Sequence, residues 1–230
     1  MRRTSKLRSL APLAAVGAGG LASYHLAIRP WHLRWGASRE ELSRPMPGDE
    51  LVRDPRHVST RAITIHARPE EVWPWLVQLG MGRAGFYGYR WFERLTELSI
   101  STVEHLLPEF QGLEPGDIIP AGRGLHLPVR AVEPNGSLVL GSRPDAPPGE
   151  ATVSWSLGLY PRDGATRLVS RVRSSYRWKP GAPLPALFLG PLHFVLERKM
   201  LLGIKQRAEA RSEGRVERPE ELLRSTGATP

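Results

Sequence analysis

The sequence predicts an α+β fold in which a curved antiparallel sheet wraps around a long C-terminal helix, with an apolar helix at the N-terminus. Between residues 58 and 176, short runs of alternating side chains are separated by proline and glycine turns, which is typical of antiparallel strands. Residues 190–212 then repeat apolar residues at helical spacing. Because few helices are available to cover the sheet, the sheet buries one of its faces best by curving around the C-terminal helix. We expect a small-molecule cavity between that helix and the sheet.

The elements follow in order along the chain. Residues 58–67 form the first predicted strand, because β-branched residues are frequent and two sets of side chains alternate. A helix over 69–79 comes next, since Pro69 suits a first helical turn and acidic residues favour its positive end. Residues 179–186 are predicted as a proline-rich loop before the last helix. Further strands are predicted at residues 117–120, 127–133, 137–141, 151–160 and 166–176, with hairpin turns at Asn135-Gly136 and Asp163-Gly164.

Composition divides the chain into four parts. Residues 1–30 resemble a membrane anchor, 31–57 are an extended lead-in rich in proline and charge, 58–211 form the ligand-binding domain, and 212–230 are a polar tail. The formal charge is +9, from 32 basic and 23 acidic residues, but the basic residues are dispersed, so we expect no nucleic-acid partner. The absence of cysteine excludes disulfides and thiolate chemistry.

The N-terminal segment carries the membrane prediction. Residues 10–28 hold no charge and follow four basic residues, and their length is close to one bilayer span. Prolines and glycines weaken the segment, so a membrane anchor, a cleaved signal and a helix packed on the domain all fit. We favour the anchor, with the N-terminus inside, which makes the membrane a partner through residues 10–28. A cytoplasmic location is the alternative.

Residues 80–85 (GMGRAG) spell the G-x-G-x-x-G pattern of dinucleotide-binding turns. That pattern needs a strand before the glycines and a helix after them. Here the preceding residues predict a helix instead, so we interpret the motif as a turn and expect no cofactor.

His193 and Glu197 are the sharpest chemical candidates. They lie one helical turn apart beside the apolar face of the last helix, and a buried carboxylate needs a partner. One interpretation is a catalytic pair in which Glu197 orients the imidazole. The favoured one is a structural ion pair between Glu197 and a sheet arginine, such as Arg171 or Arg173. A metal site would need a third ligand such as His66, His105 or His126, and the spacing supports none.

Aromatic residues complete the set of candidates. Tyr87 lies between two glycines that leave room around it, and its hydroxyl is suited to bind a ligand. Trp155 and His126 lie on or beside strands, where the register decides which face they occupy. The predicted ligand-binding residues are therefore Tyr87, Trp91, His126, Trp155, His193, Glu197 and Met200.

Residues 63–73 (ITIHARPEEVW) resemble the opening strand and helix of the SRPBCC superfamily, the START-like or birch-pollen-allergen-like helix-grip proteins often labelled polyketide cyclase/dehydrase. The resemblance covers about residues 31–211. An uncharacterised bacterial subgroup is suggested by WHLRWGA (31–37), PGDEL (47–51), GFY (85–87) and HFV (193–195). Its members commonly carry an acid where this chain has Arg90, which puts an acidic role there in doubt.

The resemblance implies a helix-grip fold but no single activity, because the superfamily includes lipid carriers, hormone receptors, cyclases and dioxygenase subunits. We expect the chain to bind a lipid, isoprenoid or polyketide-like molecule without transforming it. The alternatives are a cyclase, dehydratase or isomerase that uses His193 and Glu197, and a partner-binding domain without an open cavity.

Overall fold

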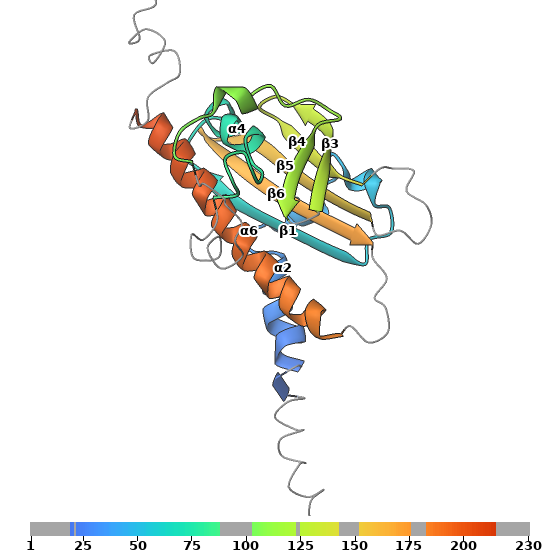
Figure 1. The fold of residues 1–230 in the computed structure, drawn as a ribbon. Helices are drawn as coiled ribbons and strands as arrows, with labels where there is room; N and C mark the ends of the chain where they lie inside the picture. The colour runs from blue at the N-terminus through green and yellow to red at the C-terminus, as the bar shows by residue number, and fades with distance from the viewer. Residues whose placement is uncertain are drawn as a thin grey trace, which may run out of the picture.

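The computed structural model describes residues 19–20, 22–87, 103–122, 125–142, 152–175 and 183–214. Its centre is a curved six-stranded sheet with the spatial order β1-β6-β5-β4-β3-β2, in which every neighbouring pair is antiparallel. This arrangement confirms the predicted fold class (Figure 1). The strands are β1 (His57–Ile65), β2 (Ile118–Gly122), β3 (Leu125–Glu133), β4 (Ser137–Gly141), β5 (Thr152–Arg162) and β6 (Ala165–Ser175).

The concave face of the sheet is the face toward the helices α4 (Pro69–Val77) and α6 (Pro183–Ser212). α6 runs along the edge strand β1 and packs against α4 (Figure 1). The main core lies between these elements. Its fully buried members include Ile65, Trp75, Leu76, Leu138, Leu140, Leu157, Leu168, Leu201 and Ile204.

Local sequence explains the longest hairpin. β5 and β6 are joined by Asp163-Gly164, whose φ angles are 49° and 76°. Two positive φ angles in a two-residue loop give the turn that matches the twist of antiparallel strands. The register then places alternate residues of both strands on the concave face.

The last helix starts earlier than predicted. α6 begins at Pro183 rather than at Gly190, so part of the expected loop at 179–186 is helical. Pro183 and Pro185 fall in the first turn, where their missing N–H groups are not needed.

The lead-in covers the convex face. Residues 31–57 fold in part into α3 (Arg39–Ser43) and the short helix η2 (Asp49–Leu51), so this segment is not extended throughout. Ser38 and Glu41 form a capping box that starts α3. A second small core of Met46, Ala62 and Val169 lies under this segment.

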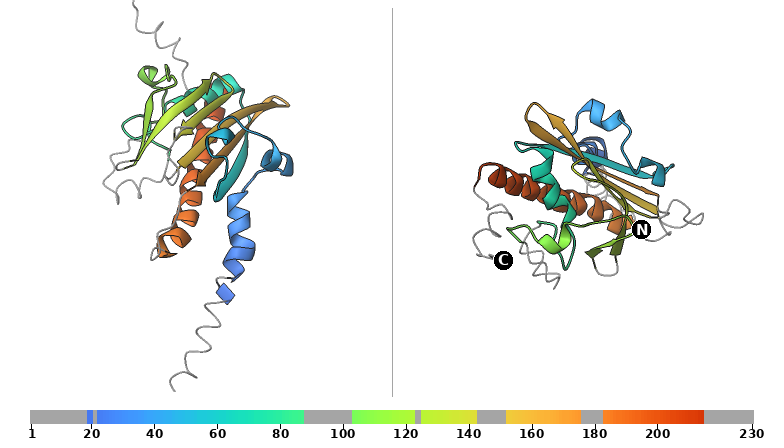
Figure 2. Two further views of the ribbon diagram at one scale, coloured as in Figure 1. Left: turned by 90° about the vertical axis from the view of Figure 1, so that its right-hand side faces the viewer. Right: turned by 90° about the horizontal axis from the view of Figure 1, so that it is seen from above.

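The N-terminal helix lies beside the first half of α6. Its described part includes η1 (Tyr24–Ile28) and α2 (Arg29–Leu33), and both it and α6 project beyond the same end of the sheet (Figures 1 and 2). Trp31 and Phe194 join the two helices, with ring centroids 5.3 Å apart. No described helix is long and apolar enough to cross a membrane, and much of the predicted anchor at 10–28 lies outside the described residues.

Candidate functional site

Half-buried apolar side chains remain on the concave face beside the core. Trp155 on β5 pairs with Val172 on β6 and with Leu140 on β4, and residues paired in this way share one face. Its indole N–H donates to the Ser170 hydroxyl at 2.9 Å, and its ring lies 6.2 Å from that of Phe86. Val153 and Val172 are also half-buried. We call Phe86, Val153, Trp155 and Val172 the apolar strip. It reaches the surface where α6 does not cover the sheet.

A buried ion pair lies next to this strip. Arg61, the cross-strand partner of Ser170, points from β1 toward α6 and bonds Glu197 there. The side chains are only 1% and 3% exposed. Arg61 also donates from Nε to the His32 carbonyl at 2.9 Å, which ties the N-terminal helix to the same point. The favoured interpretation of Glu197 as half of a structural pair therefore fits, but with an arginine that the prediction did not name.

His193 forms a cluster with Arg61 and Glu197 and lies at its exposed edge. Its Nδ1 lies 3.3 Å from Arg61 Nη1 and 3.4 Å from Glu197 Oε2, while about half of its side chain is exposed. Because a guanidinium can only donate, the shorter contact requires Nδ1 to accept, which fits a neutral imidazole. Desolvation and Arg61 lower the pKa of His193 against the opposing attraction of Glu197. Glu197 Oε1 has no hydrogen-bond partner among the described residues.

Two further histidines, His32 and His57, lie near the same positively charged groups. Burial, followed by Arg61 and Arg29, lowers the pKa of His32. Burial, with smaller contributions from Arg29, His193, Arg61 and His32, lowers the pKa of His57 to about 4. Burial and the nearby arginines therefore favour the neutral imidazole at all three histidines. No group of three potential metal ligands occurs in the described part of the chain.

The other predicted ligand-binding residues are dispersed. Tyr87 is 1% exposed; its hydroxyl donates to the Trp75 carbonyl and accepts from Gln78, so it belongs to the core. Met200 is likewise a core residue. His126 is exposed on β3, out of phase with the inward Leu127 and Val129. Trp91 lies outside the described residues. The structure brings together His193 and Glu197, and Trp155 lies two strands away from their partner Arg61, with β6 between them.

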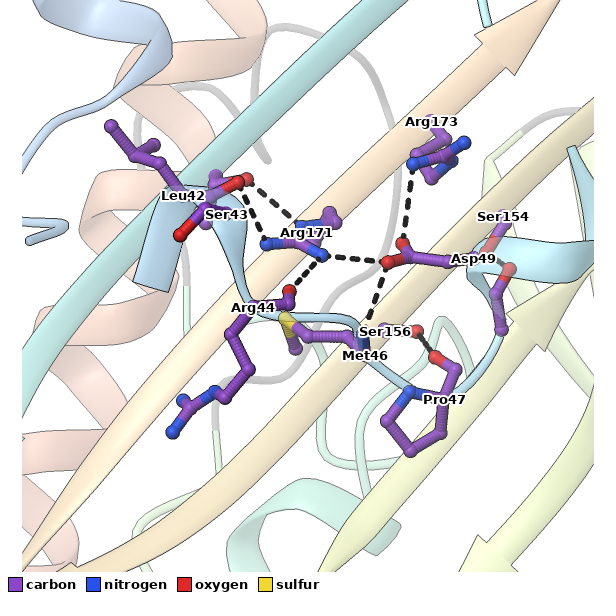
Figure 3. A network of polar contacts seen from close by, with 12 residues as sticks. Leu42, Ser43, Arg44, Met46, Pro47, Asp49, Ser154, Ser156, Arg171 and Arg173 are labelled. Carbon is purple, nitrogen blue, oxygen red and sulfur yellow. Dashed lines mark hydrogen bonds and ion pairs between the residues drawn. The ribbon is translucent and has the colours of Figure 1, made fainter. Parts of the chain in front are cut away.

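Sequence reasoning missed Arg61, although its signal was present. Arg61 alternates in phase with Ile63 and Ile65, which face the core, so its side chain had to point the same way. Arg171 and Arg173 instead occupy the convex face, where Val169 is also buried. Both form ion pairs with Asp49 of the lead-in, and Arg171 additionally donates to the Glu41 and Arg44 carbonyls (Figure 3). They fasten the lead-in and do not reach Glu197.

The glycine motif forms a turn, as predicted. Gly80 and Gly85 exchange backbone hydrogen bonds of 3.1 and 2.9 Å, and the turn follows helix α4 rather than a strand. A surface hollow of about 380 Å³ lies elsewhere, between Glu50–Asp54 and the strand ends Thr152 and Ser175, and is lined mainly by polar residues. It is not the expected cavity between helix and sheet.

No family model matches this sequence, and no curated protein does. Among solved structures, a Mesorhizobium loti protein is 18% identical over 66% of this chain and 96% of its own, with a TM-score of 0.37. A Thermobifida fusca protein is 17% identical over 68% of this chain and 95% of its own, with a TM-score of 0.40. Ara h 8.0201 is 12% identical over 66% of this chain and 97% of its own, with a TM-score of 0.37. At such values, similarity gives no information about ligands or activity. The fold class rests on the chain's own sheet and helix, and membership of the SRPBCC superfamily stays a prediction.

Proposed function

We propose that the chain binds a small hydrophobic ligand, such as a lipid, an isoprenoid or a polyketide-like aromatic, against the concave face, and does not transform it. Trp155 is the observation that carries this proposal. Its N–H is already bonded to Ser170, so the half-buried ring offers only apolar surface. Phe86, Val153 and Val172 extend that surface, and a few apolar side chains around an aromatic ring are what small apolar ligands require.

The polar groups beside the strip favour binding over catalysis. The Glu197 carboxylate is buried and neutralised by Arg61, so removing a proton from a ligand would first require breaking a buried ion pair. His193 Nδ1 is engaged by Arg61 and does not donate to Glu197 in the manner of a base oriented by a carboxylate. The cluster therefore acts as the polar wall of the binding region.

The alternative is a cyclase, dehydratase or isomerase. One observation favours it: His193 is about half exposed and only 3.4 Å from Glu197. Turnover that is lost on replacing His193 by glutamine, with ligand binding retained, would establish this alternative. Binding that depends on the apolar strip without any change in the bound mass supports the carrier.

The test compares two tryptophan substitutions on adjacent strands. Val172→Trp adds bulk to the apolar strip, whereas Val58→Trp adds the same bulk to the convex face, where Val58 is 39% exposed. Native mass spectrometry of the full chain identifies bound ligands, and titration with anilinonaphthalene sulfonate, an anionic dye that fluoresces in apolar sites, measures affinity. We expect Val172→Trp to weaken binding at least tenfold and Val58→Trp to leave it unchanged. Equal binding by both variants would place the ligand elsewhere.

A further inference from the structure

Exposed apolar side chains gather on the two helices at one end of the molecule. Seven large apolar residues are exposed among the side chains that the structure describes, and five of them lie there. We define the end-helix surface by these five: Leu26, Ile28 and Trp31 on the N-terminal helix, and Leu192 and Val195 on α6. Leu26 is 80% and Trp31 58% exposed. Apolar exposure this concentrated marks an interaction surface, because isolated exposed residues would be spread over the molecule.

The two helices form one unit. Phe194 packs against Trp31, His32 and Trp35, and Gly190 lies against Tyr24 and His32. The side chains between the two helices therefore pack against each other, while Leu192 and Val195 lie on other sides of α6. Both helices project past the sheet at the same end (Figures 1 and 2). Both helices are therefore available to a partner that docks at this end.

Charge points to one class of occupant. None of residues 1–39 is acidic, and none of residues 176–196 is, while Arg2, Arg3, Lys6, Arg8, Arg29 and Arg34 are basic. Arg34 is exposed beside the end-helix surface. Among the described residues, Arg29 and Arg34 lie on or next to this apolar surface, so it complements an anionic lipid surface, and Trp31 is the side chain best suited to the headgroup layer.

We propose that the end-helix surface docks on an anionic lipid bilayer, with Leu26, Ile28, Leu192 and Val195 at the boundary of the acyl chains. The helices lie on the bilayer, and α6 contributes Leu192 and Val195 to the contact. This extends the membrane contact predicted for residues 10–28, because it adds the first half of α6 and thereby fixes the orientation of the domain. It does not depend on the proposed ligand function.

The cysteine-free chain allows a direct test. Single variants Leu26→Cys, Leu192→Cys and Val195→Cys of the full chain each accept one environment-sensitive nitrobenzoxadiazole label. Ile118→Cys and Val58→Cys are matched controls, because these residues are 55% and 39% exposed but lie on the sheet. Each labelled protein is mixed with vesicles of phosphatidylcholine alone or with added phosphatidylserine, with and without nitroxide-bearing lipids.

We expect labels at 26, 192 and 195 to brighten several-fold with phosphatidylserine vesicles and to be quenched by the nitroxide lipids, while labels at 118 and 58 stay unchanged. A response at 26 without one at 192 and 195 would overturn the proposal, since the N-terminal segment would then insert without α6. A label at 192 that is shielded before vesicles are added, in proportion to protein concentration, would also overturn it, because a second copy of the chain would cover the surface. Quenching at 118 would refute the orientation.

Discussion

Arg61 and Glu197 form a buried ion pair that joins the edge strand β1 to the middle of α6. The Arg61 guanidinium also lies 5.4 Å from the ring centroid of Phe194 and bonds the His32 carbonyl. One side chain therefore contacts the sheet, the last helix and the N-terminal helix. We infer that this arginine fixes how α6 and α2 sit against the sheet.

The stability of the pair can be measured by removing one partner and then both. Arg61→Met leaves the Glu197 carboxylate buried without a counter-charge, so we expect the free energy of unfolding to fall by about 3–5 kcal/mol. The double variant Arg61→Met, Glu197→Leu removes both charges and should recover most of that loss. Urea unfolding followed by circular dichroism measures both. A double variant as unstable as the single one would show that the pair acts through its shape and not its charge.

Two glycines of α6 should respond in opposite ways to alanine. A Cβ at Gly203 would lie 2.5 Å from the Tyr87 Cβ and 3.2 Å from its carbonyl oxygen, so we expect Gly203→Ala to lower the unfolding free energy by about 1–3 kcal/mol. A Cβ at Gly190 meets nothing nearer than 3.7 Å. Gly190→Ala should raise stability by up to about 1 kcal/mol, because alanine favours the helix. Thermal unfolding compares the two, and destabilisation by both would mean that α6 packs differently.

The sheet and its hairpins could be predicted from sequence because their signals are local. Apolar and polar side chains alternate within each strand, and the turns at Asn135 and Asp163 lie next to the strands that they connect. The start of α6 could not, since prolines at 183 and 185 favour a loop equally well until the helix that follows is known. The covering of the convex face by the lead-in depends on tertiary contacts of Arg171, which no local pattern contains.

The candidate site was predicted less completely. The spacing of His193 and Glu197 placed both beside the sheet, and an ion pair with a sheet arginine was expected. β6 has buried residues on both faces, such as Leu168 and Val169, so its phase did not show that Arg171 points away. In β1, Ile63 and Ile65 alternate with Thr64 in the sequence, and Arg61 is in phase with the isoleucines, so Arg61 could have been identified. Tyr87 was placed by local space around it, whereas its burial depends on Gln78 and Trp75.

His57, the first residue of β1, makes stability depend on pH. Burial lowers its pKa to about 4, with added repulsion from Arg29, from Arg61 and, once they are protonated, from His193 and His32; the value expected in the unfolded chain is near 6.5. The unfolded state therefore binds more protons between these two values, and stability rises with pH there. The contribution is complete above about pH 6.5 and is lost as the pH falls through the folded pKa near 4.

Replacing the imidazole by a neutral group should remove this dependence. We expect the unfolding free energy of the wild-type chain to fall between pH 6.5 and 4 by on the order of 2 kcal/mol more than that of His57→Asn, allowing for solvent screening of a half-buried ring. His126→Asn is the matched control for the substitution itself, because His126 is an exposed strand histidine. Urea unfolding across this pH range, together with NMR titration of His57, gives both quantities. Burial and nearby positive charges both lower the pKa of a histidine. A His57 ring that titrates near 6.5 would therefore contradict the prediction, because it would show that the ring is solvated and lies beyond the influence of the charges around Arg61.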